Sequence, residues 1–264
     1  MEPAALRVYI EGVGVWSPGL ESREQANAVL RGERPFTPQS VPLPSPAVLP
    51  AAERRRSPAT ARIAVQVAAE ACAQAGVEAA QLACVFASSH GDTEISDYLC
   101  RELAVNAPLS PTRFHNSVHN AASGYWTIAV GCMQSATALS GGDESLAYGL
   151  LEAALQVAST GRPVLLVAYD QAAPAPLSSV CLISRTFGVA LVLSPSPTPR
   201  TLAAVELRDA GSAAGDVVAL GPALQALQDG NPAARILPLL SCVASARAAT
   251  LFLSPLRLEI TPCR

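Results

Sequence analysis

Hydrophobic and polar positions along the chain form a series of strand-like segments that alternate with longer, helix-like ones. Residues 7–15 alternate between apolar and polar positions and are rich in β-branched types. Residues 60–75 instead carry Ile63, Val67 and Cys72 on one helical face, and Gly76 ends that segment. Alternation of this kind predicts an α/β fold, with helices on both sides of a largely parallel sheet.

The same pattern gives the order of the elements. Gly12 and Gly14, followed by Ser17-Pro18-Gly19, predict the end of the first strand, and Ser22 with Gln25 resembles a capping box that opens a helix. Residues 35–58 are proline-rich and predict a surface loop, while residues 108–125 predict a long polar and aromatic connection of the kind that is often functional. The expected strands are residues 7–15, 82–88, 133–139, 163–169 and 187–193, and the expected helices are 22–30, 60–75, 92–105 and 143–159.

The helix expected at residues 143–159 is apolar around nearly its whole circumference. Such a helix has to be covered on more than one side. We therefore expect residues 237–243 and 250–258, the apolar parts of the C-terminal segment, to cover it.

Composition narrows the classes of partner. The chain has 264 residues, of which 50% are hydrophobic and 15% charged, and its net charge is -3, with arginine supplying all the fixed positive charge. This balance gives no broad attraction for nucleic acid or anionic lipid. No apolar stretch is long enough to span a bilayer, and the first residues do not resemble a secretory leader, so a cytoplasmic location is expected.

The cysteines and histidines do not predict a metal site. There are seven cysteines, an odd number, without a CxxC motif, and Cys72, Cys84 and Cys181 lie inside apolar runs, which favours buried, reduced thiols. His115 and His119 are four residues apart, but the sequence offers them no third ligand. No metal and no cofactor are expected.

Several segments, taken in order, resemble one enzyme family. RVYIEGVGVWSPGLESREQANAVLRGERPF is similar to the opening of a β-ketoacyl synthase, ERRRSPATARIAVQVAAEACAQAGV to its second helix, and ALSGGDESLAYGLLEAAL to the turn that carries its nucleophile. FHNSVHNAASGYWTIA is similar to the matching segment of the ketosynthase-like proteins of aryl polyene and xanthomonadin pigment clusters, and FGVALVLSP to the strand that closes the amino-terminal half. The resemblance spans about residues 6–205.

The resemblance implies a thiolase-like fold, of which only the amino-terminal half is expected here. That half would be a mixed five-stranded sheet with helices on both faces, formed by residues 1–205. Residues 206–264 would be a short extension that packs on the core in place of the missing second half. Nothing in residues 204–264 resembles the HGTGT or NxFGFGG segments through which that second half normally brings two catalytic histidines.

The resemblance also places a glycine where the family has its reactive cysteine. Aligning LAYG with the family's AIG puts Gly141 at the nucleophile position, with Ser140 and Gly142 beside it. Glycine has no thiolate or hydroxyl with which to form a thioester or ester. Asp143 and Glu144 are expected in the first turn of the next helix, where they would compete for its dipole.

These features predict a non-catalytic subunit similar to the chain length factors of type II polyketide systems, which pair with an active ketosynthase. The strand before the elbow would lie at the edge of the sheet and pair with its counterpart in the partner, and an uncovered apolar edge strand independently predicts a partner. The residues expected at the interface and along the acyl-chain tunnel are Phe114, Met133, Gln134, Ser135, Ala136 and Thr137. For each of them, simple packing is an equally good explanation.

Three consecutive arginines, Arg54, Arg55 and Arg56, could contact an acidic acyl carrier protein. The alternative is a solvated face at the start of a helix, where positive charge opposes the dipole.

Two other functions stay open. An acyltransferase or hydrolase could use Ser140 or Cys132 with a histidine from the 108–125 segment as its base. A homodimeric scaffold that binds acyl carrier protein without any ketosynthase would need no nucleophile. Acyl adducts on the isolated chain would indicate the first, and a homodimer that ignores every ketosynthase would indicate the second.

Overall fold

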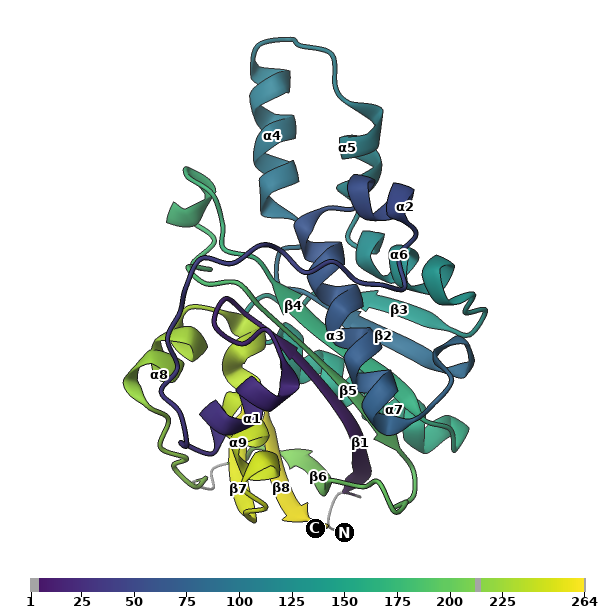
Figure 1. Ribbon diagram of the computed structural model, residues 1–264, viewed down its shortest axis with the longest axis vertical. Helices are drawn as coiled ribbons and strands as arrows, with labels where there is room; N and C mark the ends of the chain where they lie inside the picture. The colour runs from purple at the N-terminus through teal and green to yellow at the C-terminus, as the bar shows by residue number, and fades with distance from the viewer. Residues whose placement is uncertain (1–4, 212–214, 264) are drawn as a thin grey trace.

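The computed structural model describes residues 5–211 and 215–263, and the remaining residues, at the two ends and inside the predicted extension, lie outside the described part. Within it, one eight-stranded sheet runs in the order β3-β2-β4-β5-β1-β6-β8-β7 (Figure 1). The strands are β1 (Leu6–Trp16), β2 (Ala83–Ala87), β3 (Ala136–Leu139), β4 (Val164–Asp170), β5 (Phe187–Ser194), β6 (Ala203–Asp209), β7 (Ala249–Leu253) and β8 (Leu256–Pro262). The helices are α1 (Arg23–Leu30), α2 (Ala51–Arg56), α3 (Ala59–Ala75), α4 (Thr93–Ala104), α5 (Pro111–Asn116), α6 (Ala121–Val130), α7 (Ser145–Thr160), α8 (Pro222–Asp229) and α9 (Leu237–Ala244), with short 3-10 turns η1 (Ala79–Gln81), η2 (Leu177–Ser179) and η3 (Pro232–Ile236).

The five strands predicted for the amino-terminal segment are present as β3-β2-β4-β5-β1, and the α/β architecture is confirmed. Only the β3-β2-β4 part of the sheet is parallel. The β4-β5, β5-β1 and β1-β6 pairs are antiparallel. The largely parallel sheet expected from the alternation is therefore wrong, and the mixed sheet that the resemblance implied is confirmed.

The glycines of the first strand have a different role from the one predicted. β1 continues through Gly12 and Gly14 to Trp16, with an irregularity in its pairing to β5 between Ile10 and Gly12. A Cβ atom on Gly14 would lie 2.0 Å from the carbonyl oxygen of Val67, and one on Gly12 would lie 2.1 Å from that of Ala71. The glycines thus let the backbone of α3 lie directly on β1, which is the usual meaning of glycine inside a strand.

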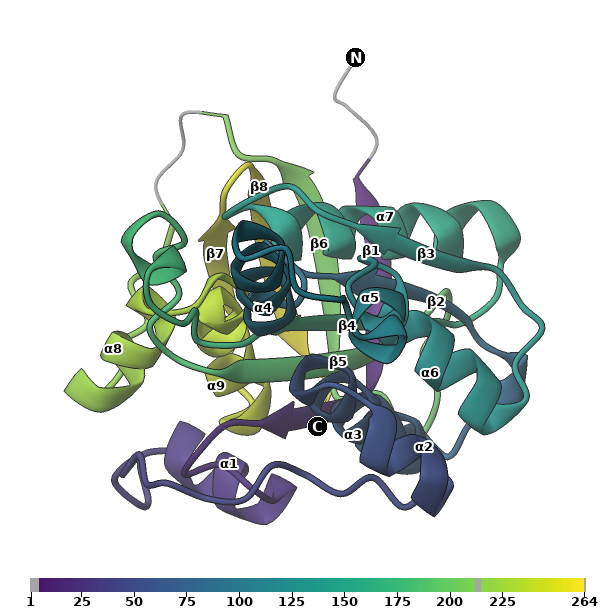
Figure 2. The same cartoon turned by 90° about the horizontal axis from the view of Figure 1, so that it is seen from above.

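Helices cover both faces of the sheet and create two apolar cores. α3 and α6 lie on one side of β2 and β4, and α7 lies on the other (Figure 2). The fully buried Trp126 of α6 and Phe86 of β2 belong to the α3 side. The α7 side is larger, because α1, α8, η3 and α9 add their apolar faces to it.

The C-terminal extension adds strands to the sheet, which corrects the predicted number of strands. The boundary expected at residue 205 falls inside β6, and β8 and β7 add two more strands beyond it, giving eight strands instead of five. β8 alternates buried Leu256, Leu258 and Ile260 with half-buried Arg257 and Glu259, the period of a strand with one face on the core. The part of the extension that contacts α7 most is η3, which precedes the residues 237–243 and 250–258 that were expected to cover it. Tyr148 and Leu155 on the outer face of α7 remain 43% and 46% exposed.

Helices also replace parts of the two predicted loops. The proline-rich segment contains α2, and the polar connection at residues 108–125 contains α5 and the start of α6. α4 and α5 lie side by side and project from the body of the molecule (Figure 1). Ser110 caps α5 by accepting from the backbone of Arg113 at 3.4 Å, a helix start that the surrounding prolines obscure.

The cysteines are free thiols in the described part of the chain, and four of them are buried, whereas Cys100 and Cys263 are exposed. Cys181, predicted to be buried, is only half-buried because its segment follows the surface turn η2. Burial raises the pKa of the Cys72 and Cys84 thiols to about 12. No helix formed by residues 5–211 and 215–263 has the length and apolar character needed to cross a membrane.

Candidate functional site

The carboxyl ends of the three parallel strands meet at one edge of the sheet. Ser88 and Ser89 follow β2, Ser140 and Gly141 follow β3, and Asp170 ends β4. In open α/β sheets this edge is where ligands and catalytic groups gather. A functional site is therefore expected at this edge.

The turn after β3 has the layout of a nucleophile elbow, but its side-chain space is filled. A Cβ atom on Gly141 would lie 2.3 Å from Cδ2 and 2.9 Å from Cε2 of Tyr148, which lies in the first turn of α7. The backbone N–H of Gly141 donates to the Ser145 hydroxyl at 2.9 Å. That hydroxyl in turn donates to the carbonyl of Gly142 at 2.6 Å. The elbow therefore offers neither a nucleophile nor a free donor of the kind that stabilises an oxyanion at position 141.

The acidic residues of the elbow lie just before the helix and not in its first turn. α7 begins at Ser145, and Glu144 is the residue just before it. Asp143 is bound by Arg235 of η3, which donates to its carboxylate at 2.8 Å and to its carbonyl at 2.9 Å. The extension thus holds the elbow through an ion pair rather than through apolar cover alone.

The residues proposed for an alternative nucleophile are engaged in structural contacts. The Ser140 hydroxyl donates to the Ser89 carbonyl at 2.8 Å, and the buried Cys132 thiol donates to the Leu82 carbonyl at 3.3 Å. His119 contacts the Ser88 carbonyl through Nε2 at 3.1 Å. In the described residues no hydrogen bond joins Ser140 or Cys132 to a histidine.

Asp170 is a buried carboxylate that binds the ends of β2 and β4 together. Its Oδ1 accepts from the Ser89 hydroxyl at 2.7 Å, the Ser89 N–H at 2.8 Å and the Ser88 hydroxyl at 2.9 Å. Burial raises the pKa of Asp170 above its ordinary value, and these hydrogen bonds oppose the rise. Asn231 from the extension donates to the carbonyl of the same residue at 2.9 Å.

Stability should fall with rising pH because of Asp170. An acid with a raised pKa in the folded state takes up a proton on folding, so its favourable contribution is complete below the ordinary value of 3.8 and is lost as pH rises through the raised value. We expect Asp170→Asn, which keeps the acceptor, to raise the free energy of unfolding at pH 8 by about 1 kcal/mol. Urea unfolding of both proteins between pH 4 and pH 8 measures this, and a wild-type advantage that grows with pH would contradict it.

β3 forms an open edge of the sheet. Within the described chain β2 is its only strand neighbour. Met133 is 93% exposed, Ser135 and Ala136 are also exposed, Gln134 accepts from Arg162 at 3.3 Å, and Thr137 accepts from Gln156 at 3.1 Å. Phe114, 61% exposed, lies on α5 and not on this strand.

The opposite edge of the sheet is protected. Asp216 donates its backbone N–H to the Thr250 carbonyl of β7 at 2.6 Å, and its carboxylate accepts from the Thr250 N–H at 2.7 Å. These contacts occupy the outward-facing backbone groups of Thr250 and hinder edge-to-edge pairing at that point. The contrast between a covered β7 and an open β3 singles out β3 as the edge available to another chain.

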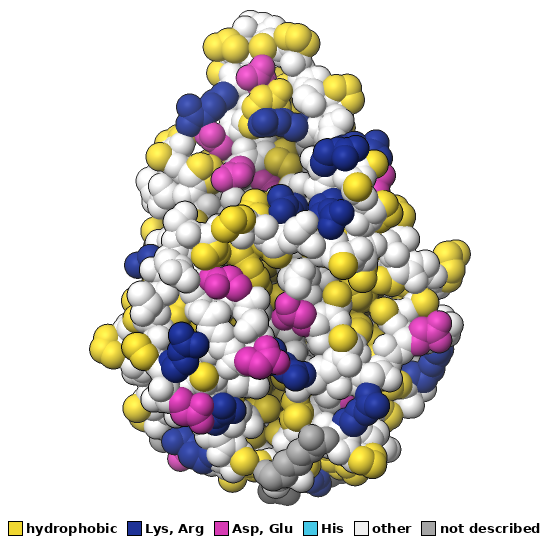
Figure 3. All heavy atoms as spheres, viewed as in Figure 1, with side chains coloured by type: hydrophobic (Ala, Val, Ile, Leu, Met, Phe, Trp, Pro, Cys, Tyr) yellow, Lys and Arg dark blue, Asp and Glu magenta, His cyan; other side chains and the backbone are white. Residues whose placement is uncertain are grey.

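The three arginines lie at the end of a helix, which corrects the expectation that they begin one. α2 finishes with Arg54, Arg55 and Arg56, where positive charge favours the dipole, and Arg56 pairs with Glu53 of the same helix. Their helix ends here because Ser57 is extended before Pro58. Basic side chains gather over this part of the surface (Figure 3).

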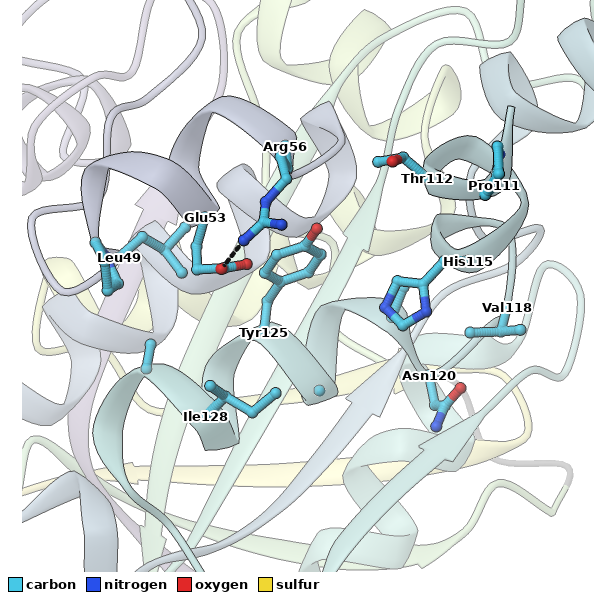
Figure 4. Close-up of a pocket in the computed structure, with 14 residues that line it drawn as sticks. Leu49, Glu53, Arg56, Pro111, Thr112, His115, Val118, Asn120, Tyr125 and Ile128 are labelled. Atoms are coloured by element: carbon cyan, nitrogen blue, oxygen red, sulfur yellow. Dashed lines mark hydrogen bonds and ion pairs between the residues drawn. The ribbon is translucent and has the colours of Figure 1, made fainter. Parts of the chain in front are cut away.

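A cavity of about 510 Å³ lies between α2, α5 and α6 (Figure 4). α6 contributes residues at helical spacing, Ala121, Gly124, Tyr125, Ile128 and Ala129. The other walls are formed by Leu49, Pro50, Glu53, Arg56, Pro111, Thr112, His115, Val118 and Asn120. None of the predicted tunnel residues lines it, although Arg56 does.

Comparison with known proteins shows the family of the chain. Residues 30–231 match the family described as Beta-ketoacyl synthase, N-terminal domain. The chain belongs to the β-ketoacyl synthase family. Among curated protein sequences, none matches it.

Solved structures give the thiolase-like fold of this β-ketoacyl synthase domain. A ketosynthase (ApeO) in complex with its chain length factor (ApeC) from Xenorhabdus doucetiae matches with a TM-score of 0.73 and 22% identity, over 97% of this chain and 99% of that one. A β-ketoacyl synthase from Burkholderia phymatum STM815 matches with a TM-score of 0.58 and 14% identity, over 86% of this chain and 70% of that one. The ishigamide ketosynthase/chain length factor matches with a TM-score of 0.55 and 17% identity, over 79% of this chain and 65% of that one.

Sequence reasoning predicted the strand, turn and helix of residues 136–160 but missed the contacts made around Gly141. Tyr148, Ser145 and Arg235 were not singled out, and only Tyr148 carried a signal, as a large aromatic residue beside small ones in LAYG. Among residues 5–211 and 215–263, no cluster of three or more histidine, cysteine, aspartate or glutamate side chains could hold a metal ion.

Proposed function

We propose that this member of the β-ketoacyl synthase family is a non-catalytic subunit, similar to a chain length factor, that pairs with an active ketosynthase and shapes the path of the growing acyl chain. The observation that carries the proposal is Gly141, whose side-chain space is filled by Tyr148 and whose N–H is already bonded to Ser145. An acyl transfer needs an activated nucleophile at the elbow. At this elbow the ring of Tyr148 occupies the space that a nucleophilic side chain would need.

The open edge of β3 supports pairing with another subunit. Met133, with Ser135 and Ala136, offers an exposed edge, while the other end of the sheet is covered by Asp216. A solved neighbour is described as a ketosynthase in complex with its chain length factor. An antiparallel pairing of β3 with the matching strand of a ketosynthase would continue the sheet across the interface, and such obligate interfaces commonly bury more than about 2,000 Å².

An acyl carrier protein is the second proposed partner. Arg54, Arg55 and Arg56 lie together at the end of α2, and Arg56 lines the cavity between α2, α5 and α6. Another solved neighbour is described as a type II polyketide acyl carrier protein in complex with its ketosynthase. An acidic carrier would meet positive charge here, and such complementarity raises the association rate more than the affinity. The subunit itself would need no cofactor.

The pairing is tested with Met133→Asp. We expect this substitution to weaken binding at least tenfold to a ketosynthase with which the wild-type chain co-purifies, because a carboxylate would be buried at the paired edge. Met133 is 93% exposed in the isolated chain, so folding should be unaffected. Size-exclusion chromatography with light scattering measures the heterodimer after co-expression.

Val217→Asp is the matched control, since Val217 is 92% exposed and lies away from β3. A wild-type chain that forms a homodimer and ignores every neighbouring ketosynthase would contradict the proposal and favour the scaffold function. Covalent acyl adducts on Ser140 or Cys132 of the isolated chain, found by mass spectrometry, would favour the catalytic one.

A further inference from the structure

We propose that the outer face of α7 is an interface at which two copies of this chain pair about a two-fold axis, with their α7 helices antiparallel. The inference goes beyond the proposed function, because it uses a surface other than the edge of β3. Tyr148 and Leu155 lie on this face and are half-exposed, and Ala158 is exposed beside them. α7 lies along the side of the molecule opposite α3 (Figure 2), where another chain can reach it.

The apolar positions of this face have the spacing of a coiled-coil seam. Three or four residues separate each position from the next, and the positions are Tyr148, Leu151, Leu155 and Ala158. This is the a/d pattern, in which each side chain inserts between four side chains of a facing helix. The side of α7 that packs on the sheet uses other residues, such as the fully buried Leu150 and Val157. The seam therefore predicts a helix that faces α7 from outside.

The surroundings of the seam have the character of an interface. On one side lies a cavity of about 310 Å³, lined by Leu151 of the seam and by leucines of β1, β6 and β8. On the other side the Gln156 amide donates to Glu152 at 2.8 Å and to Thr137 of β3 at 3.1 Å. An apolar centre beside a polar, hydrogen-bonded margin is the usual anatomy of a protein–protein interface.

Charge at the two ends of α7 identifies the occupant as a second copy of the chain. Glu144 precedes the helix, and Arg162 follows its last residue closely. Arg162 donates to the Gln134 side chain at 3.3 Å and to the Gln81 carbonyl at 3.4 Å, and in the described part of the chain neither Glu144 nor Arg162 forms an ion pair. The helix thus carries an unpaired acid at its start and an unpaired base at its end.

One register satisfies both the seam and these charges. In an antiparallel pair the a positions pack against the d positions of the facing helix, so Leu155 lies opposite Leu151 and Ala158 lies opposite Tyr148. The same register places Arg162 of each copy opposite Glu144 of the other. The face is therefore complementary to itself, as a two-fold interface requires.

This pairing leaves the edge of β3 available. The exposed Met133 and Ala136 of that edge do not belong to the seam. Each copy in the pair can therefore still bind a ketosynthase, which gives an assembly of four chains.

Self-association of the isolated chain tests the inference. Sedimentation equilibrium should show a reversible dimer as the protein concentration rises from about 1 µM to about 500 µM. Leu155→Glu places a carboxylate in each half of the seam and should weaken the dimer about tenfold or more. Leu155 is already half-exposed, so the variant should stay folded, which circular dichroism checks. Leu182→Glu is the matched control, because Leu182 is 79% exposed and lies outside the seam, and it should leave the dimer unchanged.

Exchange of the two charges tests the register. Glu144→Arg and Arg162→Glu should each weaken the dimer about threefold or more, because each places like charges opposite one another at two symmetric positions. The variant with both substitutions carries the pair in reverse and should recover the affinity of the wild type. A double variant that dimerises no more tightly than the single variants would overturn the antiparallel register.

The two interfaces are separated by their own variants. Met133→Asp should leave this dimer intact, and Leu155→Glu should leave the pairing with a ketosynthase intact. The inference is overturned by a chain that stays monomeric over the whole concentration range, by a Leu155→Glu dimer as tight as that of the wild type, or by loss of the dimer in Met133→Asp. A dimer that no ketosynthase joins would support the inference and contradict the proposed function.

Discussion

Replacing Gly14 by valine is expected to prevent folding at 37 °C. The Cβ atom would lie 2.0 Å from the carbonyl oxygen and 2.8 Å from the carbonyl carbon of Val67, both backbone atoms of α3. A helix backbone cannot move aside as a side-chain tip can, so α3 would have to lift from β1 and open the core that contains Trp126 and Phe86. Overpacking costs about 1–3 kcal/mol and occasionally more, and the loss of this contact places Gly14→Val at about 3 kcal/mol or above.

Gly14→Ala should show the same effect in a measurable form. Its free energy of unfolding, from urea titration followed by circular dichroism, should fall by about 2–3 kcal/mol, a large part of the 5–15 kcal/mol typical of a folded domain. Gly124→Ala makes the same chemical change where a Cβ meets nothing, and it should be neutral or stabilising. Equal stabilities of the two variants would show that α3 adjusts freely over β1.

The strands and helices of the amino-terminal segment could be predicted because their signals are local. Gly76 ends α3 with a left-handed backbone at φ 65°, and Ser22 accepts from the N–H of Gln25 at 3.2 Å, as the sequence indicated. The elbow after β3 was found in the same way, from the small residues that follow an apolar run. Such patterns fix the type of an element but not its partners.

The extension of the sheet could not be predicted, because it depends on pairing over long sequence separations. β6 is an inner strand because it pairs with both β1 and β8, and Leu207 lies opposite Leu6 on one side and Leu258 on the other. The alternation of β8 is visible in the sequence, but its place in the sheet is not.

The cavity and the closed elbow were missed for a related reason. The cavity lies where prolines and polar residues indicate loops, yet α2 and α5 form there and meet α6. Gly141 was recognised from the sequence. The contact of the Tyr148 ring with it depends on the position of Tyr148 in α7. Both sites depend on where side chains lie in space, which no local pattern contains.

Gly141→Cys is expected to destabilise the protein, and a change at Tyr148 is expected to restore it. The added Cβ would lie 2.3 Å from the ring, so Tyr148 has to leave its position at a cost of about 1–2 kcal/mol. In Gly141→Cys with Tyr148→Ile, the residue that the resemblance places there, most of that loss should return. The two substitutions would thus couple by more than about 1 kcal/mol in a double-mutant cycle of urea unfolding.

The alkylation rate of a cysteine at position 141 measures whether the Tyr148 ring covers that position. The thiol introduced at position 141 should be alkylated by iodoacetamide several times faster in the double variant than in Gly141→Cys alone, because the ring no longer covers it, while neither variant should turn over acyl thioesters. Turnover requires a base and an oxyanion site, and the N–H of residue 141 stays bonded to Ser145 in both. Additive stabilities and equal alkylation rates would show that Tyr148 does not fill the nucleophile position, and acyl turnover by the double variant would show that the elbow lacks only its cysteine.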